Sequence, residues 1–92
     1  MNIFLWDNEK NDILKKTRGV CFEQIVLRME KGDILDLIAH PNQERYQGQK
    51  IALIGIDDYV YLVPYVQHGE ELFLKTIIPG RNATNKYVRN KP

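Results

Sequence analysis

The sequence predicts an α+β fold in a single domain spanning residues 1–92. Two segments with helical caps and spacing lie near the N-terminus, and four apolar segments separated by turn residues follow them. With 43% hydrophobic residues the chain can build a small core. The predicted order is β-α-α-β-β-β-β-α, in which an antiparallel sheet carries both N-terminal helices on one face.

The N-terminal segment predicts a strand followed by a helix. Residues 2–6 are apolar and aromatic, which is typical of a strand. Asp7 is a good N-cap, and the helix should run to about Thr17 or Arg18 before Gly19 ends it. Most of this helix should face water, so several of its side chains are free to contact another molecule: Asn8, Lys10, Asn11, Lys15 and Lys16.

A second helix should begin near Cys21 and close at Gly32. Its apolar residues follow the i, i+3, i+4, i+7 rule: Phe22, Ile25, Val26 and Met29. Cys21 and Gln24 occupy the positions of a capping box, although cysteine is a poor substitute for serine there.

The remaining elements are four predicted strands and a short polar helix. The strands are residues 33–40, 50–56, 59–66 and 72–78, with a polar loop at 41–48. Both faces of 59–66 are apolar, which predicts a central strand, yet Pro64 favours an edge or a bulge. The last strand should stop at Pro79-Gly80, where the short helix starts. Its alternation predicts one face with Leu72, Leu74, Thr76 and Ile78, and the other with Phe73, Lys75 and Ile77.

Charge is distributed unevenly although the net charge is only +1. Residues 75–92 carry five basic side chains and no acidic one: Lys75, Arg81, Lys86, Arg89 and Lys91. Because Lys75 and Arg81 flank the Pro79-Gly80 break, they are expected near each other at one end of the sheet. This local field is a candidate phosphate-binding surface, and a solvated basic tail is the alternative.

Several chemistries are excluded or disfavoured by residue content. The chain has no serine, which excludes a Ser-His-Asp hydrolase. Its single cysteine, Cys21, allows no internal disulfide, and a capping thiol is the simpler role for it. No metal-ligand spacing and no phosphate-cradling glycine loop is present, so neither a metal nor a cofactor is expected. Without a signal-like or membrane-spanning segment, a cytoplasmic protein is expected.

RNA cleavage by a ribose 2′-hydroxyl needs no protein nucleophile, and this sequence permits it. The protein must align the 2′-oxygen, stabilise the pentavalent phosphate and help move two protons. Arginine clamps phosphate through its planar fork, and lysine or tyrosine assists proton transfer. The candidate catalytic residues are Arg81, Lys75, Tyr87, Lys10 and Arg18. Lys16, Lys86 and Trp6 are the candidate RNA-binding residues, although Trp6 could instead be a core aromatic.

Three segments together resemble a known family over nearly the whole chain. They are residues 6–11 (WDNEKN) running into 16–23 (KTRGVCFE), the strand-turn-strand of 51–66, and residues 75–84 (KTIIPGRNAT). In order and spacing they are similar to the BrnT toxins, which are type II toxin–antitoxin ribonucleases of the RelE/ParE-like superfamily. By position, Trp6, Asp7 and Lys10 match the family's N-terminal motif, and Arg81 matches the arginine after its last strand.

The resemblance implies a cytoplasmic ribonuclease toxin that inhibits translation and growth. An antitoxin with a ribbon-helix-helix domain would neutralise it, and the complex would repress its own operon. A homodimer and a toxin–antitoxin heterotetramer are both compatible with this. The last 18 residues, with Arg89 and Lys91, are the expected antitoxin contact. No membrane partner is expected.

This chain also departs from the family pattern. Where K-H-G is common before the second helix, it has Lys16-Thr17-Arg18-Gly19, so the histidine is absent. Lys75 stands where an arginine is common on the last strand. The alternative is therefore a non-catalytic protein of the same fold that acts through protein contacts, as a degenerate toxin or an operon co-repressor.

Overall fold

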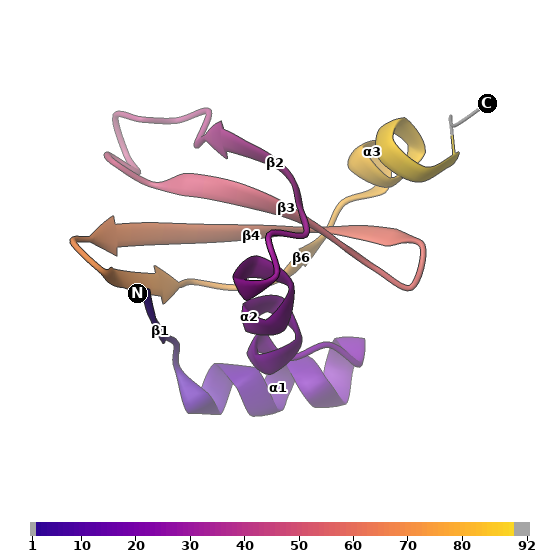
Figure 1. The fold of residues 1–92 in the computed structure, drawn as a ribbon, viewed down its shortest axis with the longest axis horizontal. Helices are drawn as coiled ribbons and strands as arrows, with labels where there is room; N and C mark the ends of the chain where they lie inside the picture. The colour runs from indigo at the N-terminus through magenta and orange to yellow at the C-terminus, as the bar shows by residue number, and fades with distance from the viewer. Residues whose placement is uncertain (1, 90–92) are drawn as a thin grey trace.

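Figure 1 shows the computed structural model, which describes residues 2–89 and has an α+β architecture. The elements in chain order are β1 (Ile3–Leu5), α1 (Asn8–Arg18), α2 (Phe22–Glu30), β2 (Ile34–Ala39), β3 (Lys50–Ile56), β4 (Tyr59–His68), β5 (Glu71–Leu74), β6 (Ile78–Pro79), α3 (Arg81–Thr84) and a π-helical segment, η1 (Asn85–Arg89). The α+β class is thus confirmed. In residues 2–89, no helix combines the length and apolar character that a bilayer crossing requires.

The sheet is mixed, so the prediction of a wholly antiparallel sheet is wrong. Its strand order is β1-β5-β4-β3-β2, with β6 beside β4. Ile3 lies beside Glu71 and Leu5 beside Phe73, which makes β1 parallel to β5, whereas the other pairs are antiparallel. The apolar pattern of a short strand does not state which neighbour it joins or in which direction.

Helix α1 begins and ends where its capping residues predict. The carboxylate of Asp7 accepts hydrogen bonds from the backbone N–H groups of Glu9 (2.9 Å) and Lys10 (3.2 Å). Gly19 ends the helix in the left-handed conformation at φ 68°, which glycine adopts without a steric penalty.

Helix α2 begins after Cys21, as predicted, and Gln24 supplies one half of the expected capping box. The side-chain oxygen of Gln24 accepts the N–H of Cys21 at 3.0 Å. At the other end, Asp33 N–H donates to the carbonyl of Arg28 and Gly32 N–H donates to Met29. This pair of bonds satisfies carbonyl groups that the helix end would otherwise leave without a partner.

The sheet buries apolar side chains on both faces. On one face, Leu14 of α1 and Phe22 and Ile25 of α2 pack in the main core with Ile54 of β3 and Val63 of β4. α2 crosses this face, while α1 lies lower, alongside the chain that links β5 to β6 (Figure 1). The prediction of two helices on one face is therefore matched only in part.

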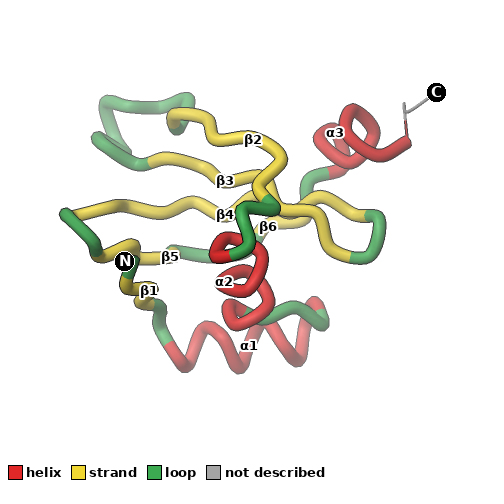
Figure 2. Tube along the Cα trace, in the orientation of Figure 1, coloured by secondary structure: helices red, strands yellow, loops and turns green. Residues whose placement is uncertain are grey.

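A smaller core occupies the opposite face of the sheet. Its buried members are Ile51 and Leu53 of β3 and Val60 of β4, and α3 and η1 pack against them through Ala83, Tyr87 and Val88. The short C-terminal helix that the sequence predicts is therefore a cover for this second face, as the separated red segment of Figure 2 shows.

A bulge interrupts the pairing of β4 opposite Pro64. Tyr65 pairs with Leu74 of β5, and Leu62 pairs with Ile78 of β6. Two residues of β4 therefore face three residues, 75–77, of the neighbouring chain. The carbonyl of Pro64 accepts the N–H of Lys75 at 2.8 Å, so the missing N–H of the proline faces the interruption. β4 is central, as predicted, and Pro64 lies at a bulge.

The extra residue shifts the inward-facing positions by one. Leu72 and Leu74 are buried in the main core as predicted, but the next buried residue is Ile77, whose exposed fraction is 0%. Ile78 is 41% exposed. The predicted face of Leu72, Leu74, Thr76 and Ile78 is thus wrong after residue 74. The predicted strand 72–78 is divided into β5 and β6, with residues 75–77 as a linker.

Gly80 and Thr84 fasten α3 to β4. Gly80 N–H donates to the carbonyl of Val60 at 2.9 Å. The Thr84 hydroxyl accepts the N–H of Val60 at 2.8 Å and donates to the carbonyl of Gly80 at 2.7 Å. A Cβ at Gly80 would lie 3.3 Å from the Val60 carbonyl oxygen and from Leu62, which explains a glycine at this crossing.

Candidate functional site

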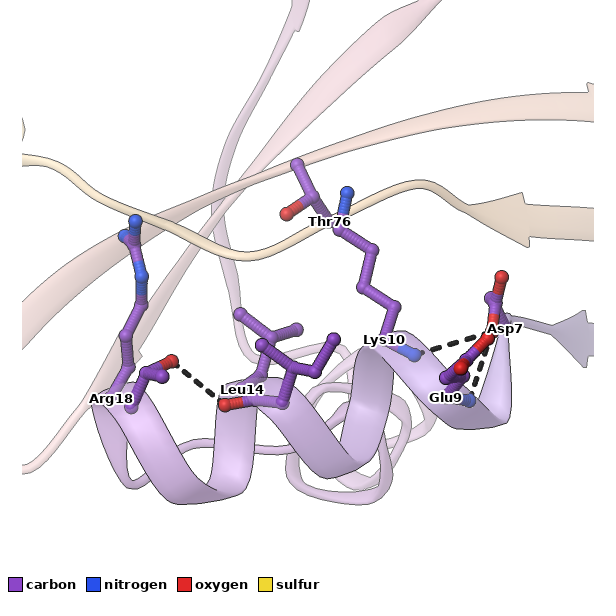
Figure 3. A pocket seen from close by; sticks show the side chains of 8 residues that line it. Asp7, Glu9, Lys10, Leu14, Arg18 and Thr76 are labelled. Atoms are coloured by element: carbon purple, nitrogen blue, oxygen red, sulfur yellow. Dashed lines mark hydrogen bonds between the residues drawn. The ribbon is translucent and has the colours of Figure 1, made fainter.

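Two cavities flank the linker of residues 75–77. The first, here called the α1 cavity, has a volume of about 510 Å³ and lies between α1 and the linker (Figure 3). It is lined by Asp7, Glu9, Lys10, Ile13, Leu14, Thr17, Arg18 and Thr76. The second, here called the loop cavity, has a volume of about 440 Å³ and is lined by His40, Tyr46, Gln49, Pro64, Lys75, Thr76 and Ile78. Thr76 is the wall that the two cavities share.

The α1 cavity brings Lys10 together with Arg18. They lie two turns apart on α1, a rise of about 12 Å, and both side chains extend toward the linker that carries Thr76 (Figure 3). Asp7 and Glu9 lie at the Lys10 end, where the Asp7 carboxylate is engaged in capping the helix. The Arg18 end is therefore the more electropositive part of this cavity.

Lys75 lies in the loop cavity, on the other side of the linker from Lys10 and Arg18. Its ammonium nitrogen is 4.7 Å from the centroid of the Phe73 ring, a cation–π contact that holds it near the strand. Three predicted site residues thus border two adjoining cavities: Lys10 and Arg18 line the α1 cavity, and Lys75 lines the loop cavity.

Arg81 is exposed at the first turn of α3 and lines neither cavity. The backbone of Lys75 bonds to Pro64 and that of Gly80 to Val60. Four residues of an extended strand separate these points, a distance of about 13 Å. The backbone therefore does not bring Lys75 and Arg81 close together, although the sequence predicts that it should. In the described part of the chain, no carboxylate forms an ion pair with Arg81.

Tyr87 and Lys86 lie on η1, away from both cavities. The Tyr87 hydroxyl donates to the Asp36 carboxylate of β2 at 2.9 Å, and its ring packs on the smaller core. The Lys86 ammonium is 5.2 Å from the centroid of the Tyr87 ring. In this arrangement Tyr87 connects the C-terminal segment to the sheet.

Trp6 and Lys16 also lie outside the two cavities. The Trp6 ring stacks on Phe22 with 5.8 Å between centroids and packs against the main core, which is the core role that the sequence left open. Its indole nitrogen is buried, with no hydrogen-bond partner among residues 2–89. Lys16 is exposed on α1.

Asn11 holds α1 against α2 and so positions the wall of the α1 cavity. The sequence predicts Asn11 on the wet face, but the structure buries it to 3% exposure, which overturns that prediction. Its side-chain oxygen accepts the N–H of Phe22 at 2.8 Å, and its amide donates to Glu23 at 2.7 Å. Lys15 lies 3.6 Å from the same carboxylate. Helical spacing alone does not predict this role of Asn11. The role arises because the first backbone N–H groups of α2 have no partner within that helix and need a hydrogen-bond acceptor from elsewhere.

The hydrogen bond from Asn11 is the main cause that holds the pKa of Glu23 below its ordinary value of 4.5. A carboxylate with a lowered pKa in the folded state adds stability above that ordinary value and loses it as the pH falls through the folded pKa. We therefore expect Glu23→Gln to reduce the fall in melting temperature between about pH 6 and about pH 3, followed by circular dichroism. The exposed Glu30→Gln is the control, and an identical fall in both variants would contradict this role for Glu23.

Sequence reasoning missed three polar residues of the loop cavity: His40, Tyr46 and Gln49. They belong to a segment that was predicted only as a polar loop or its borders. A signal was present, since Tyr46 is the only Phe, Tyr or Trp between Phe22 and Tyr59. An isolated aromatic in a polar loop indicates a role other than the main core.

Comparison with known proteins leaves the family of the chain open. No protein-family model, no curated protein and no solved structure matches it. Among residues 2–89, no group of three His, Cys, Asp or Glu side chains is arranged to hold a metal ion. Of the expected antitoxin contact, Lys91 and the side chain of Arg89 lie outside the described part of the chain.

Proposed function

We propose that this protein is a BrnT-type toxin of the RelE/ParE-like superfamily that cleaves RNA by metal-independent attack of a 2′-hydroxyl. The observation that carries the proposal is the alignment of Lys10, Arg18 and Lys75 along the two sides of one linker. A single strand of RNA laid across Thr76 would meet cationic side chains in both cavities. The order of elements, with two helices after the first strand and a helix after the last, supports the assignment to this superfamily.

The α1 cavity has groups suited to the charge of the transition state. When the 2′-oxygen attacks, negative charge grows on the phosphate oxygens until the bond to the 5′-oxygen breaks. The guanidinium of Arg18 offers two parallel donors to such oxygens, and the ammonium of Lys10 adds a second positive charge. Arg81 on α3 and Lys86 on η1 lie outside both cavities and add positive charge on the side of the sheet that the smaller core covers.

An antitoxin would silence such a protein by covering this surface. The acid-free C-terminal segment is suited to an acidic antitoxin chain, and a ribbon-helix-helix domain on that chain would link the complex to its operator DNA. Growth arrest in a bacterial host without the antitoxin, through loss of translation in the cytoplasm, is the expected cellular effect.

We expect the purified protein to cut RNA in the presence of a chelator and to leave 2′,3′-cyclic phosphate and 5′-hydroxyl ends. Lys10→Ala and Arg18→Ala should each slow cleavage by about tenfold or more, because each removes a charge that stabilises the transition state. Gel assays on a labelled RNA measure these rates. Arg28→Ala on α2 and Lys31→Ala at the C-cap of α2 are matched controls outside both cavities. Intact RNA with the parent protein, or parent rates in both α1 variants, would overturn the proposal.

A non-catalytic protein of the same fold is the second candidate, and one observation favours it. Asp7 and Glu9 share the α1 cavity with the cations, and their charges oppose the binding of phosphate. In that case RNA should stay intact after long incubation with folded protein, while the protein still binds its antitoxin. Calorimetry of the complex beside the cleavage assay separates the two candidates.

A further inference from the structure

The loop between β2 and β3 is held in shape by its own side chains. The amide of Gln43 donates to the carbonyls of His40 (2.8 Å) and Gln49 (3.2 Å), and its side-chain oxygen accepts the N–H of Gly48 at 3.2 Å. Asn42 N–H donates to Nδ1 of His40 at 3.1 Å. These bonds order the backbone of the loop and hold the His40 ring through its Nδ1, so part of the site is formed without a ligand.

One hydrogen bond determines what His40 presents to a ligand. Because Nδ1 accepts the N–H of Asn42, the proton of the neutral ring resides on Nε2. The free ring nitrogen of His40 is therefore a hydrogen-bond donor. A donor in the cavity that Lys75 also lines is suited to an anion or to the oxygen of a nucleobase.

Aromatic and cationic groups adjoin in the loop cavity. The rings of His40 and Tyr46 lie 4.2 Å apart between centroids at an angle of 33°, and both line the cavity. Lys75 lines the same cavity, and the guanidinium carbon of Arg45 lies 5.5 Å from the centroid of the Tyr46 ring. Stacking rings next to positive charge are the features with which proteins bind single-stranded nucleic acid.

We propose that the loop cavity is a nucleotide subsite for single-stranded RNA. The base stacks against the His40–Tyr46 pair, and the phosphate binds the ammonium of Lys75 and the Nε2–H of His40. This subsite rests on the proposed function, because it takes RNA as the ligand. Since Thr76 borders both cavities, the neighbouring phosphate of the same strand enters the α1 cavity, and the subsite selects which bond lies there.

The test measures binding of a fluorescein-labelled hexamer of mixed sequence whose riboses all carry 2′-O-methyl groups. This probe lacks the attacking hydroxyl, so binding is separated from cleavage. Fluorescence anisotropy should show that Tyr46→Ala weakens binding about tenfold or more, whereas Tyr46→Phe, which keeps the ring, stays within about twofold. Lys75→Ala should weaken binding and lower the slope of log K against log salt by about 0.7, the value for one phosphate of a single strand.

His40→Asn completes the set, because its side-chain oxygen replaces Nδ1 as the acceptor for Asn42 while the ring and Nε2 are lost. It should weaken binding at least fivefold, and His68→Asn, at a histidine that lines neither cavity, should not. Lys31→Ala is the control for Lys75→Ala. Thermal melts establish that each variant is folded, and Tyr46→Phe keeps the comparison valid if Tyr46→Ala unfolds.

The outcomes separate this proposal from the nuclease proposal. If the parent protein does not bind the probe, or Lys75→Ala and His40→Asn bind it as the parent does, the subsite is overturned. If those variants also cut unmodified RNA at the parent rate, the nuclease proposal survives without the subsite. If the variants lose binding while the parent leaves unmodified RNA intact, the subsite stands and the nuclease proposal fails.

Discussion

Replacing Ile77 with alanine should destabilise the protein by about 3 kcal/mol, within the range of large-to-small substitutions in buried cores. Ile77 has no exposed surface and packs in the main core with Leu72 and Leu74. The substitution removes apolar contacts and leaves a cavity that the sheet and helices close only in part. Urea unfolding followed by tryptophan fluorescence measures the change, since Trp6 packs against the same core.

Ile78→Ala is the matched control for Ile77→Ala. Its side chain is 41% exposed at the rim of the loop cavity, so we expect a loss below about 1 kcal/mol. The simple alternation of the sequence predicts the opposite order, because it places Ile78 rather than Ile77 on the face of Leu74. An equal or larger loss for Ile78→Ala would show that the bulge opposite Pro64 is misplaced.

Asn11→Ala should cost about 2–3 kcal/mol of stability, although it replaces a polar residue of an amphipathic helix by the best helix former. The substitution leaves the buried N–H of Phe22 without its acceptor and removes the bond to Glu23. An unsatisfied buried donor retains its full desolvation cost. Because this network positions α1, RNA cleavage should also fall in conditions where the variant is folded.

Asn8→Ala, on the exposed first turn of α1, is the control for Asn11→Ala. Its effect on the urea midpoint should stay within about 0.5 kcal/mol. Hydrogen exchange at the Phe22 amide provides a second measurement, because the loss of its acceptor should speed exchange there before it does so in β3 and β4. Equal stability of both variants would contradict a bridging role for Asn11.

Much of the fold could be predicted because its signals are local. Asp7 and Gly19 delimit α1, and Gln24 caps the start of α2 as expected. Asp57-Asp58 forms the tight turn between the predicted strands 50–56 and 59–66, with positive φ values of 51° and 61° at the two aspartates. Pro64 indicates a bulge from the sequence alone, because a residue without an N–H is compatible with a central strand only where the strand pairing is interrupted.

What the sequence could not supply depends on relations between distant segments. The direction of β1 depends on its pairing with β5, 68 residues away at Ile3 and Glu71. The position of Lys75 depends on the bulge opposite Pro64, beside which Lys75 lines a cavity with residues of the loop at 40–49. The sequence therefore predicts the cationic residues of the candidate site, Lys10, Arg18 and Lys75. It does not predict the His40–Tyr46 pair.

The lid formed by α3 and η1 sets a condition on any regulator of this protein. Val60, Ile51 and Leu53 lie beneath that lid, and the bonds of Thr84 and Tyr87 fasten it to β4 and β2. An inhibitor that displaced residues 81–89 would expose an apolar face of the sheet to solvent. A regulator must therefore bind the outer surface of the lid, or insert apolar side chains of its own where the lid packs.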